Sequence, residues 1–193
     1  MDTFPMGHST FGKMFEGNKL NLPNPEPLHE EDTIDVPYYF VADDAFAITE
    51  NLLKPHGVGP DPFDREKRIF NYRLSRARRV VENLFGILAS RFGVFQRPMM
   101  LSPEKATIVT IASCYLHNFL RKKSDRYVSL GSVDWEDANY NINDGEGHAT
   151  QRDLAGLCPT FRRNVTERAK FVRETLQRYF CNQRSVPWQL KYV

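Results

Sequence analysis

Residues 64–92 place their apolar side chains on one helical stripe, and this long amphipathic segment constrains the fold more than any other. The apolar positions recur at spacings of three, four and seven: Phe70, Leu74, Ala77, Val81, Leu84, Phe85, Leu88 and Phe92. That period predicts a helix with one face toward a core. Asp64 is placed to cap its first turn, and a second cap or kink near Asn71 is expected to split it.

Other stretches predict smaller elements around this helix. Residues 38–42 are aromatic or small and apolar, which predicts a buried strand, and residues 47–56 predict a short helical turn ending at Pro55. Residues 102–123 open with Ser102 and Pro103, which is typical of a helix start. Because this segment is apolar on more than one side, we expect a buried helix. A last amphipathic helix is predicted over residues 160–180.

The chain is therefore expected to be an α/β protein with four parts. These are an irregular segment (1–37), a principal domain (38–123), an acidic flexible loop (124–160) and a C-terminal helix with its tail (161–193).

Charge is strongly segregated along the chain, although the net charge is only +2. Residues 64–126 carry 14 basic and 5 acidic side chains, a net charge of +9, whereas residues 1–63 carry −8. A basic block of this size attracts polyanions such as DNA, but solvated helix faces explain the same composition. No apolar run approaches the roughly 20 residues that span a bilayer, so we expect no membrane segment.

Three acids are candidate ligands for a divalent metal. Asp43 and Asp44 follow the predicted strand, and Glu82 lies at the rim of the long helix, one turn after Arg78. Carboxylates that converge at the end of a strand suit Mg²⁺ or Mn²⁺. An ordinary ion pair between Arg78 and Glu82 is the competing interpretation. The helix also carries arginines suited to holding phosphates: Arg73, Arg76, Arg78 and Arg79.

Three strings in this order resemble the PIF/Harbinger transposase-derived nuclease family: "VPYYFVADDAFAITENLLKPH", "FNYRLSRARRVVENLFGILASRF" and "CYLHNFL". The segments "LNLPNPEPL" and "VPWQ" add to the resemblance, which covers residues 10–122 and, more weakly, 161–189. It implies the C-terminal half of a DDE endonuclease domain, a partial ribonuclease H-like (DDE transposase/integrase) fold with one to three strands and several α-helices.

The resemblance also assigns roles to individual acids. Asp43 matches the family's second catalytic aspartate, with Asp44 beside it as a further metal ligand, and Glu82 matches the third acid of the triad. The first aspartate belongs to an earlier strand, and Asp2 has no strand context. We therefore expect a fragment or a domesticated remnant with weak or no nuclease activity.

The same resemblance implies Mg²⁺ or Mn²⁺ as the cofactor, DNA as the substrate, a Myb-like DNA-binding protein as partner and a nuclear location, with a cytoplasmic pool left open. The alternative function is a non-catalytic module that binds DNA or protein. His117 and Asn118, in "LHNFL", invite a catalytic interpretation, but a local hydrogen bond on a helix is the expected role of His117.

Overall fold

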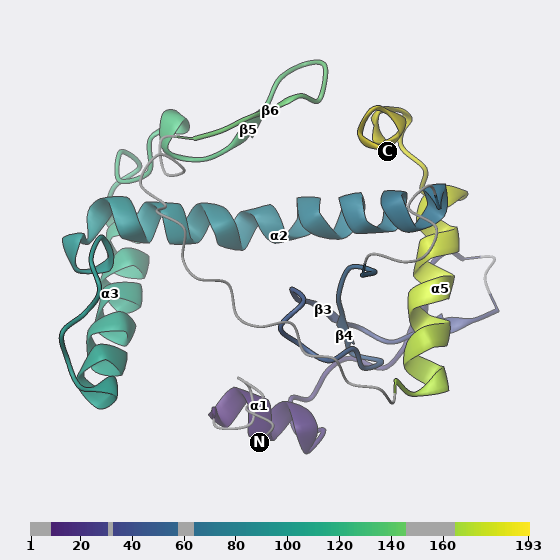
Figure 1. Ribbon diagram of the computed structural model, residues 1–193, viewed down its shortest axis with the longest axis horizontal. Helices are drawn as coiled ribbons and strands as arrows, with labels where there is room; N and C mark the ends of the chain where they lie inside the picture. The colour runs from purple at the N-terminus through teal and green to yellow at the C-terminus, as the bar shows by residue number, and fades with distance from the viewer. Residues whose placement is uncertain (1–8, 31–32, 58–63, 146–164) are drawn as a thin grey trace. The chain divides into compact units, whose positions relative to one another are not determined.

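The computed structural model describes residues 9–30, 33–57, 64–145 and 165–193 (Figure 1). These residues form a mixed helix and strand structure with small two-stranded sheets, which agrees with the predicted α/β class. The helices are α1 (Thr10–Glu16), α2 (Arg65–Arg91), α3 (Pro103–Lys123) and α5 (Glu167–Cys181), with the 3₁₀ turns η1 (Gly93–Phe95), η2 (Leu130–Ser132) and η3 (Pro187–Tyr192). The strands are β1 (Glu26–Pro27), β2 (Asp35–Val36), β3 (Phe40–Val41), β4 (Leu52–Leu53), β5 (Trp135–Glu136) and β6 (Ile142–Asn143).

The chain divides into two compact units, and each is described by itself. The first comprises Met1–Arg78 with Leu157–Val193, and the second comprises Arg79–Gly156. The four-part division predicted from the sequence stays a prediction.

The core of the first unit lies between the β3–β4 pair, the first half of α2 and helix α5 (Figure 1). Phe70 and Leu53 are fully buried there, and Leu176 is 1 % exposed. Helix α5 presents Ala169, Val172 and Leu176 to this core, as its predicted stripe requires. Thr166 begins the helix, because its hydroxyl accepts the backbone N–H of Ala169 at 3.2 Å. The predicted residues 160–164 lie outside the described part of the chain.

Helix α2 begins where Asp64 was predicted to cap it. The Asp64 carboxylate accepts the backbone N–H of Lys67 at 3.1 Å. The predicted break near Asn71 is wrong, since the helix runs without interruption from Arg65 to Arg91. The Asn71 side chain bonds outside its own helix: it accepts the N–H of His56 at 2.7 Å and donates to the His56 carbonyl at 3.0 Å. It therefore does not compete for the backbone of α2.

The predicted helical turn over residues 47–56 is also wrong, because this stretch contains β4. Strands β3 and β4 pair in parallel, with Phe40 opposite Leu52 and Val41 opposite Leu53. The N–H of Ala42 donates to the carbonyl of Leu53 at 2.8 Å. The buried strand is β4 rather than β3, in which Phe40 is 38 % exposed. Pairing with β3 and burial of both leucines override the local helical pattern.

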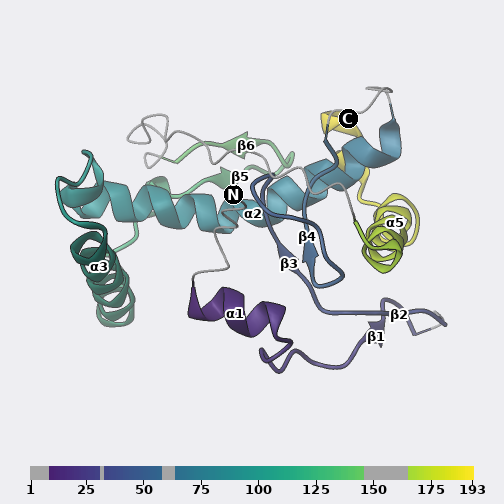
Figure 2. The same cartoon turned by 60° about the horizontal axis from the view of Figure 1, so that its bottom comes forward.

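The segment before β3 contains more structure than predicted. Ser9 caps the short helix α1 by accepting the N–H of Gly12 at 2.9 Å, and β1 pairs antiparallel with β2 (Figure 2). Phe11 of α1 meets Phe40 edge-on, with ring centroids 5.4 Å apart. A seven-residue helix is marginal by itself, so this tertiary contact adds to the Ser9 cap in stabilising it.

In the second unit, α3 begins as predicted at Ser102 and Pro103 but is not the buried helix that its composition indicated. Ile108 is 66 % exposed and Tyr115 is 73 % exposed. His117 is buried, and its Nδ1 lies 3.1 Å from the hydroxyl of Tyr127. The expected local hydrogen bond is confirmed.

A β-hairpin that the sequence did not predict follows α3. Strands β5 and β6 pair antiparallel across a turn in which the Asp137 carboxylate accepts the backbone N–H groups of Asn139 and Asn141, both at 2.8 Å. This side chain closes the turn in the manner of an Asx motif. Two residues of α2 hold the hairpin. Arg79 pairs with Glu136 at 3.1 Å, and Oδ1 of Asn83 accepts the backbone N–H of Asp134 at 2.9 Å.

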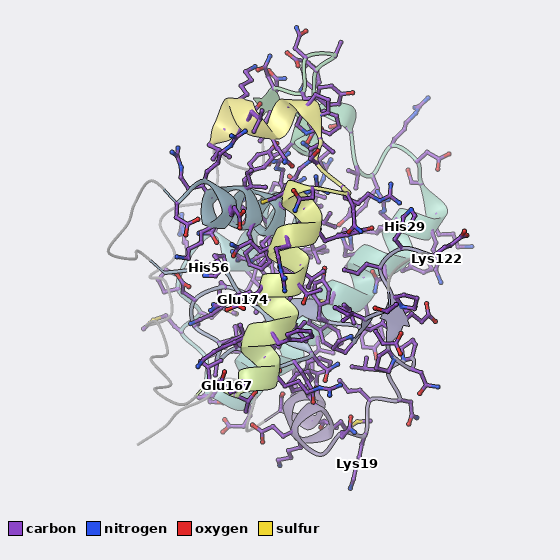
Figure 3. All side chains as sticks on the ribbon, turned by 90° about the vertical axis from the view of Figure 1, so that its right-hand side faces the viewer. Lys19, His29, His56, Lys122, Glu167 and Glu174 are labelled. Carbon is purple, nitrogen blue, oxygen red and sulfur yellow. The ribbon has the colours of Figure 1, made fainter. Side chains whose placement is uncertain are left out.

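The His56 ring lies beside α5 and Phe70, and its environment makes stability dependent on pH (Figure 3). Burial, followed by the charge of Arg173, lowers the pKa of His56 from 6.5 to about 4. The unfolded chain thus takes up this proton near pH 6.5 and the folded chain only near pH 4, so stability falls as pH drops through that window. Between pH 7 and pH 5 we expect a loss of about 1 kcal/mol, allowing for solvent screening of a half-buried ring.

Urea unfolding at the two pH values measures this loss. His56→Gln is expected to remove most of the difference, whereas His29→Gln, at an exposed position, leaves it intact. An equal pH dependence in the His56→Gln protein contradicts the assignment.

Candidate functional site

Asp43 stands at the carboxyl end of β3, inside a tight turn. Its Oδ1 accepts the backbone N–H of Ala45 at 3.0 Å, and its carbonyl accepts that of Phe46 at 3.3 Å. Its Oδ2 lies 3.8 Å from Nη2 of Arg78. The side chain of Asp43 is 42 % exposed, so the acid that follows the strand is neither buried nor without a counter-charge.

Asp44 contacts Lys54 through its backbone. Its carbonyl accepts a hydrogen bond from Nζ of Lys54 at 3.1 Å, and the residue is exposed. Arg78 and Lys54 thus both approach this turn with positive charge. The two carboxylates of the turn after β3 are thus matched by two cations.

Glu82 lies in the middle of α2 and is half-buried. It belongs to the second unit, whereas Asp43 and Asp44 belong to the first. The predicted metal-ligand set of Asp43, Glu82 and Asp44 stays a prediction.

All four predicted DNA-binding arginines have contacts within the protein. Arg78 faces Asp43, and Arg79 pairs with Glu136 of β5 at 3.1 Å. Arg76 donates to the hydroxyl of Tyr72 at 3.0 Å and lies over the ring of Trp188, 5.3 Å from its centroid. Arg73 lies over the ring of Phe180 at 4.9 Å. Their role toward DNA stays a prediction, and the structure assigns each of them a contact that the sequence did not.

Sequence reasoning missed how the C-terminal segment packs on α2 (Figure 1). Tyr192 of η3 stacks on Tyr72, with ring centroids 4.9 Å apart and planes 9° apart. Gln189 is 2 % exposed and accepts a hydrogen bond from Arg73 Nη1 at 3.4 Å. The alternation of aromatic and polar residues in "VPWQLKY" is a signal for such packing, although it does not reveal the partner helix.

A divalent metal requires several oxygen ligands at one point. Within residues 9–30, 33–57, 64–145 and 165–193, no three His, Cys, Asp or Glu side chains gather as a metal would require. One oxygen of Asp43 is already engaged by the turn. The contacts of Asp43 by themselves do not make a metal centre, and no cleavage step follows from them.

Comparison with known protein families identifies the family to which this chain is related. The sequence profile described as DDE superfamily endonuclease matches residues 8–118, which is more than half of the chain. The chain belongs to this family. No curated protein matches the chain, and no solved structure matches it.

The matched residues include the segments that carry the candidate acids. Asp43, Glu82 and the four arginines all fall inside residues 8–118, whereas α5 and η3 fall outside them. The expected membership in an endonuclease family is confirmed at this level. Among the described helices, none is both long enough and apolar enough to cross a membrane.

Proposed function

We propose that this DDE endonuclease-family chain is a DNA-binding module of PIF/Harbinger type that cleaves phosphodiesters weakly or not at all by itself. The family match supports it, since that match spans both Asp43 and Glu82. A ribonuclease H-like fold is part of the proposal. Its support is the parallel β3–β4 pair with Asp43 at the carboxyl end of β3, the end at which open α/β sheets bind ligands.

The charge distribution supports DNA as the ligand. Residues 64–126 carry a net charge of +9, and the backbone of DNA attracts such a block through release of its counterions. Mg²⁺ or Mn²⁺, which DDE endonucleases generally use, remains the expected cofactor of any residual cleavage, with Asp43 and Glu82 in the family's acid positions. A Myb-like partner and a nuclear location remain predictions, motivated by the resemblance alone.

Two measurements on the full chain test the proposal. We expect the affinity for duplex DNA to fall about 10- to 100-fold between 50 and 200 mM salt, as for a few phosphate contacts. We also expect wild type and Asp43→Asn to nick supercoiled DNA equally slowly in Mn²⁺. Asp35→Asn, at the exposed position of β2, serves as the matched control.

Each measurement has an outcome that overturns part of the proposal. An affinity that does not change with salt rejects DNA binding by electrostatic attraction. Nicking that is fast in wild type and in Asp35→Asn but absent in Asp43→Asn shows instead that the chain is an active metal-dependent nuclease.

A further inference from the structure

A pocket of about 400 Å³ opens in the first unit, between the first half of α2, the end of α5 and the C-terminal segment. It is lined by Arg73, Arg76, Ala77, Phe180, Val186 and Trp188. Two of these side chains are cations and two are aromatic rings, and none is acidic.

The two guanidinium groups act on each other. Burial, and after it the charge of Arg76, lowers the pKa of Arg73. Arg184 acts in the same direction. A bound anion relieves this repulsion, and planar guanidinium groups hold phosphate oxygens through paired hydrogen bonds.

The geometry leaves Arg73 able to accept a ligand without losing its present partners. Its two hydrogen bonds, to the carbonyl of Arg184 at 3.2 Å and to Oε1 of Gln189 at 3.4 Å, both come from Nη1. A guanidinium carries five N–H donors in all. The donors on Nη2 and Nε are therefore distinct from the Nη1 group that makes these two bonds.

Each aromatic ring of the pocket lies against one of its cations: Arg73 lies over Phe180, and Arg76 lies over Trp188. Trp188 is half-buried, and Phe180 forms a second wall. Nearby, Tyr72 of α2 stacks on Tyr192 of η3. Every nucleobase has a flat face that stacks on such rings, and this stacking does not depend on the base.

We propose that this pocket binds one nucleotide unit, with its phosphate on Arg73 and Arg76 and its base against Trp188. The proposal deepens the proposed DNA-binding function, and it rests on that function only for the source of the nucleotide. A phosphorylated nucleoside reaches the pocket either as part of a DNA strand or as a free nucleotide, and the test separates the two.

The intrinsic fluorescence of Trp188 reports on the pocket. The chain has two tryptophans, so the full chain with Trp135→Phe, at a 51 % exposed position, leaves Trp188 as the only one. This protein is titrated with deoxyadenosine monophosphate, deoxyadenosine, inorganic phosphate and a short single-stranded oligonucleotide. We expect saturable quenching by the monophosphate and the oligonucleotide, and binding at least about tenfold weaker for deoxyadenosine and for phosphate.

Substitutions in the same background locate the site. Arg76→Gln is expected to weaken monophosphate binding at least about tenfold, because a charged donor is lost. Arg68→Gln, an exposed position on the same helix outside this pocket, is the matched control and is expected to change it less than twofold. Arg76→Lys keeps the charge without the planar fork and serves as the second variant if Arg76→Gln melts at a much lower temperature than its parent. We expect the Arg76→Lys protein to bind the monophosphate more weakly than its parent with Arg76.

The outcomes separate this proposal from the proposed function. No saturable quenching by any of the four ligands overturns it, as does an equal loss in Arg68→Gln and Arg76→Gln. Monophosphate binding together with no duplex binding keeps the pocket, assigns it to free nucleotides and rejects the DNA-binding function. A third outcome keeps the DNA-binding function and rejects the pocket. In it the chain binds duplex DNA, but Arg76→Gln and Arg76→Lys leave its affinities for the monophosphate and the oligonucleotide unchanged.

Discussion

Phe70→Ala is expected to lower the free energy of unfolding by about 3–5 kcal/mol, the range for a large side chain removed from a packed core. Phe70 is fully buried, packs edge-on against His56 at 5.3 Å and faces Phe180 at 6.1 Å. It is the place where α2, α5 and the segment after β4 meet. Removal of the ring therefore leaves a cavity that the three surrounding elements cannot fill by moving inward.

Phe171→Ala is the matched control for this change. Phe171 lies on α5 in the same unit and is 46 % exposed, so we expect a loss below about 1 kcal/mol. Urea unfolding of both variants measures the difference. Similar losses for the two variants contradict the core described for the first unit.

The long stripe was readable from the sequence as one helix, although only three of its eight apolar positions are buried. Leu74 and Leu88 are buried as predicted, at 2 % and 7 % exposure, and Asp64 caps the helix as expected. Ala77, Val81 and Phe85 depart from the prediction, since all three are exposed, Phe85 at 51 %. A period of 3.6 shows which residues share a face, and it does not show how far the partner elements extend along that face.

The remaining errors have a common physical origin. Leu52 and Leu53 form a strand because β3 supplies the backbone partners, and α3 is exposed although its sequence is apolar on more than one side. Both depend on what lies next to the segment in space. The β5–β6 hairpin depends on one carboxylate, Asp137, whose ability to close a turn is a weak signal among many Asn and Asp residues.

For the candidate acid Asp43, too, the sequence predicted one part of the outcome and not the other. The sequence placed Asp43 after a strand, and the structure confirms that position. It did not reveal the Asx turn that engages one oxygen, or Arg78 facing the other. Local pattern gave the position of the acid, and packing decided its partners.

Gln189→Leu is expected to lower the free energy of unfolding by about 2–3 kcal/mol and to loosen the C-terminal segment from α2. The Gln189 amide is 2 % exposed and makes three hydrogen bonds: its Oε1 accepts from Arg73 at 3.4 Å and from the N–H of Val186 at 3.3 Å, and its Nε2 donates to the carbonyl of Phe180 at 3.2 Å. Leucine fills a similar volume but removes all three hydrogen bonds from a buried site, and this loss outweighs the added apolar surface.

Two readouts separate this effect from general destabilisation. Urea unfolding gives the loss in free energy, and Trp188 emission in the Trp135→Phe background shifts to longer wavelength under native conditions if η3 leaves α2. Gln183→Leu is the matched control, because Gln183 is exposed, and we expect it to change neither readout. If Gln189→Leu leaves the emission of Trp188 and the stability unchanged, the buried amide does not hold the segment. The pocket formed by Arg73, Arg76 and Trp188 then owes its shape to the aromatic contacts, of which the stack of Tyr72 on Tyr192 is the closest.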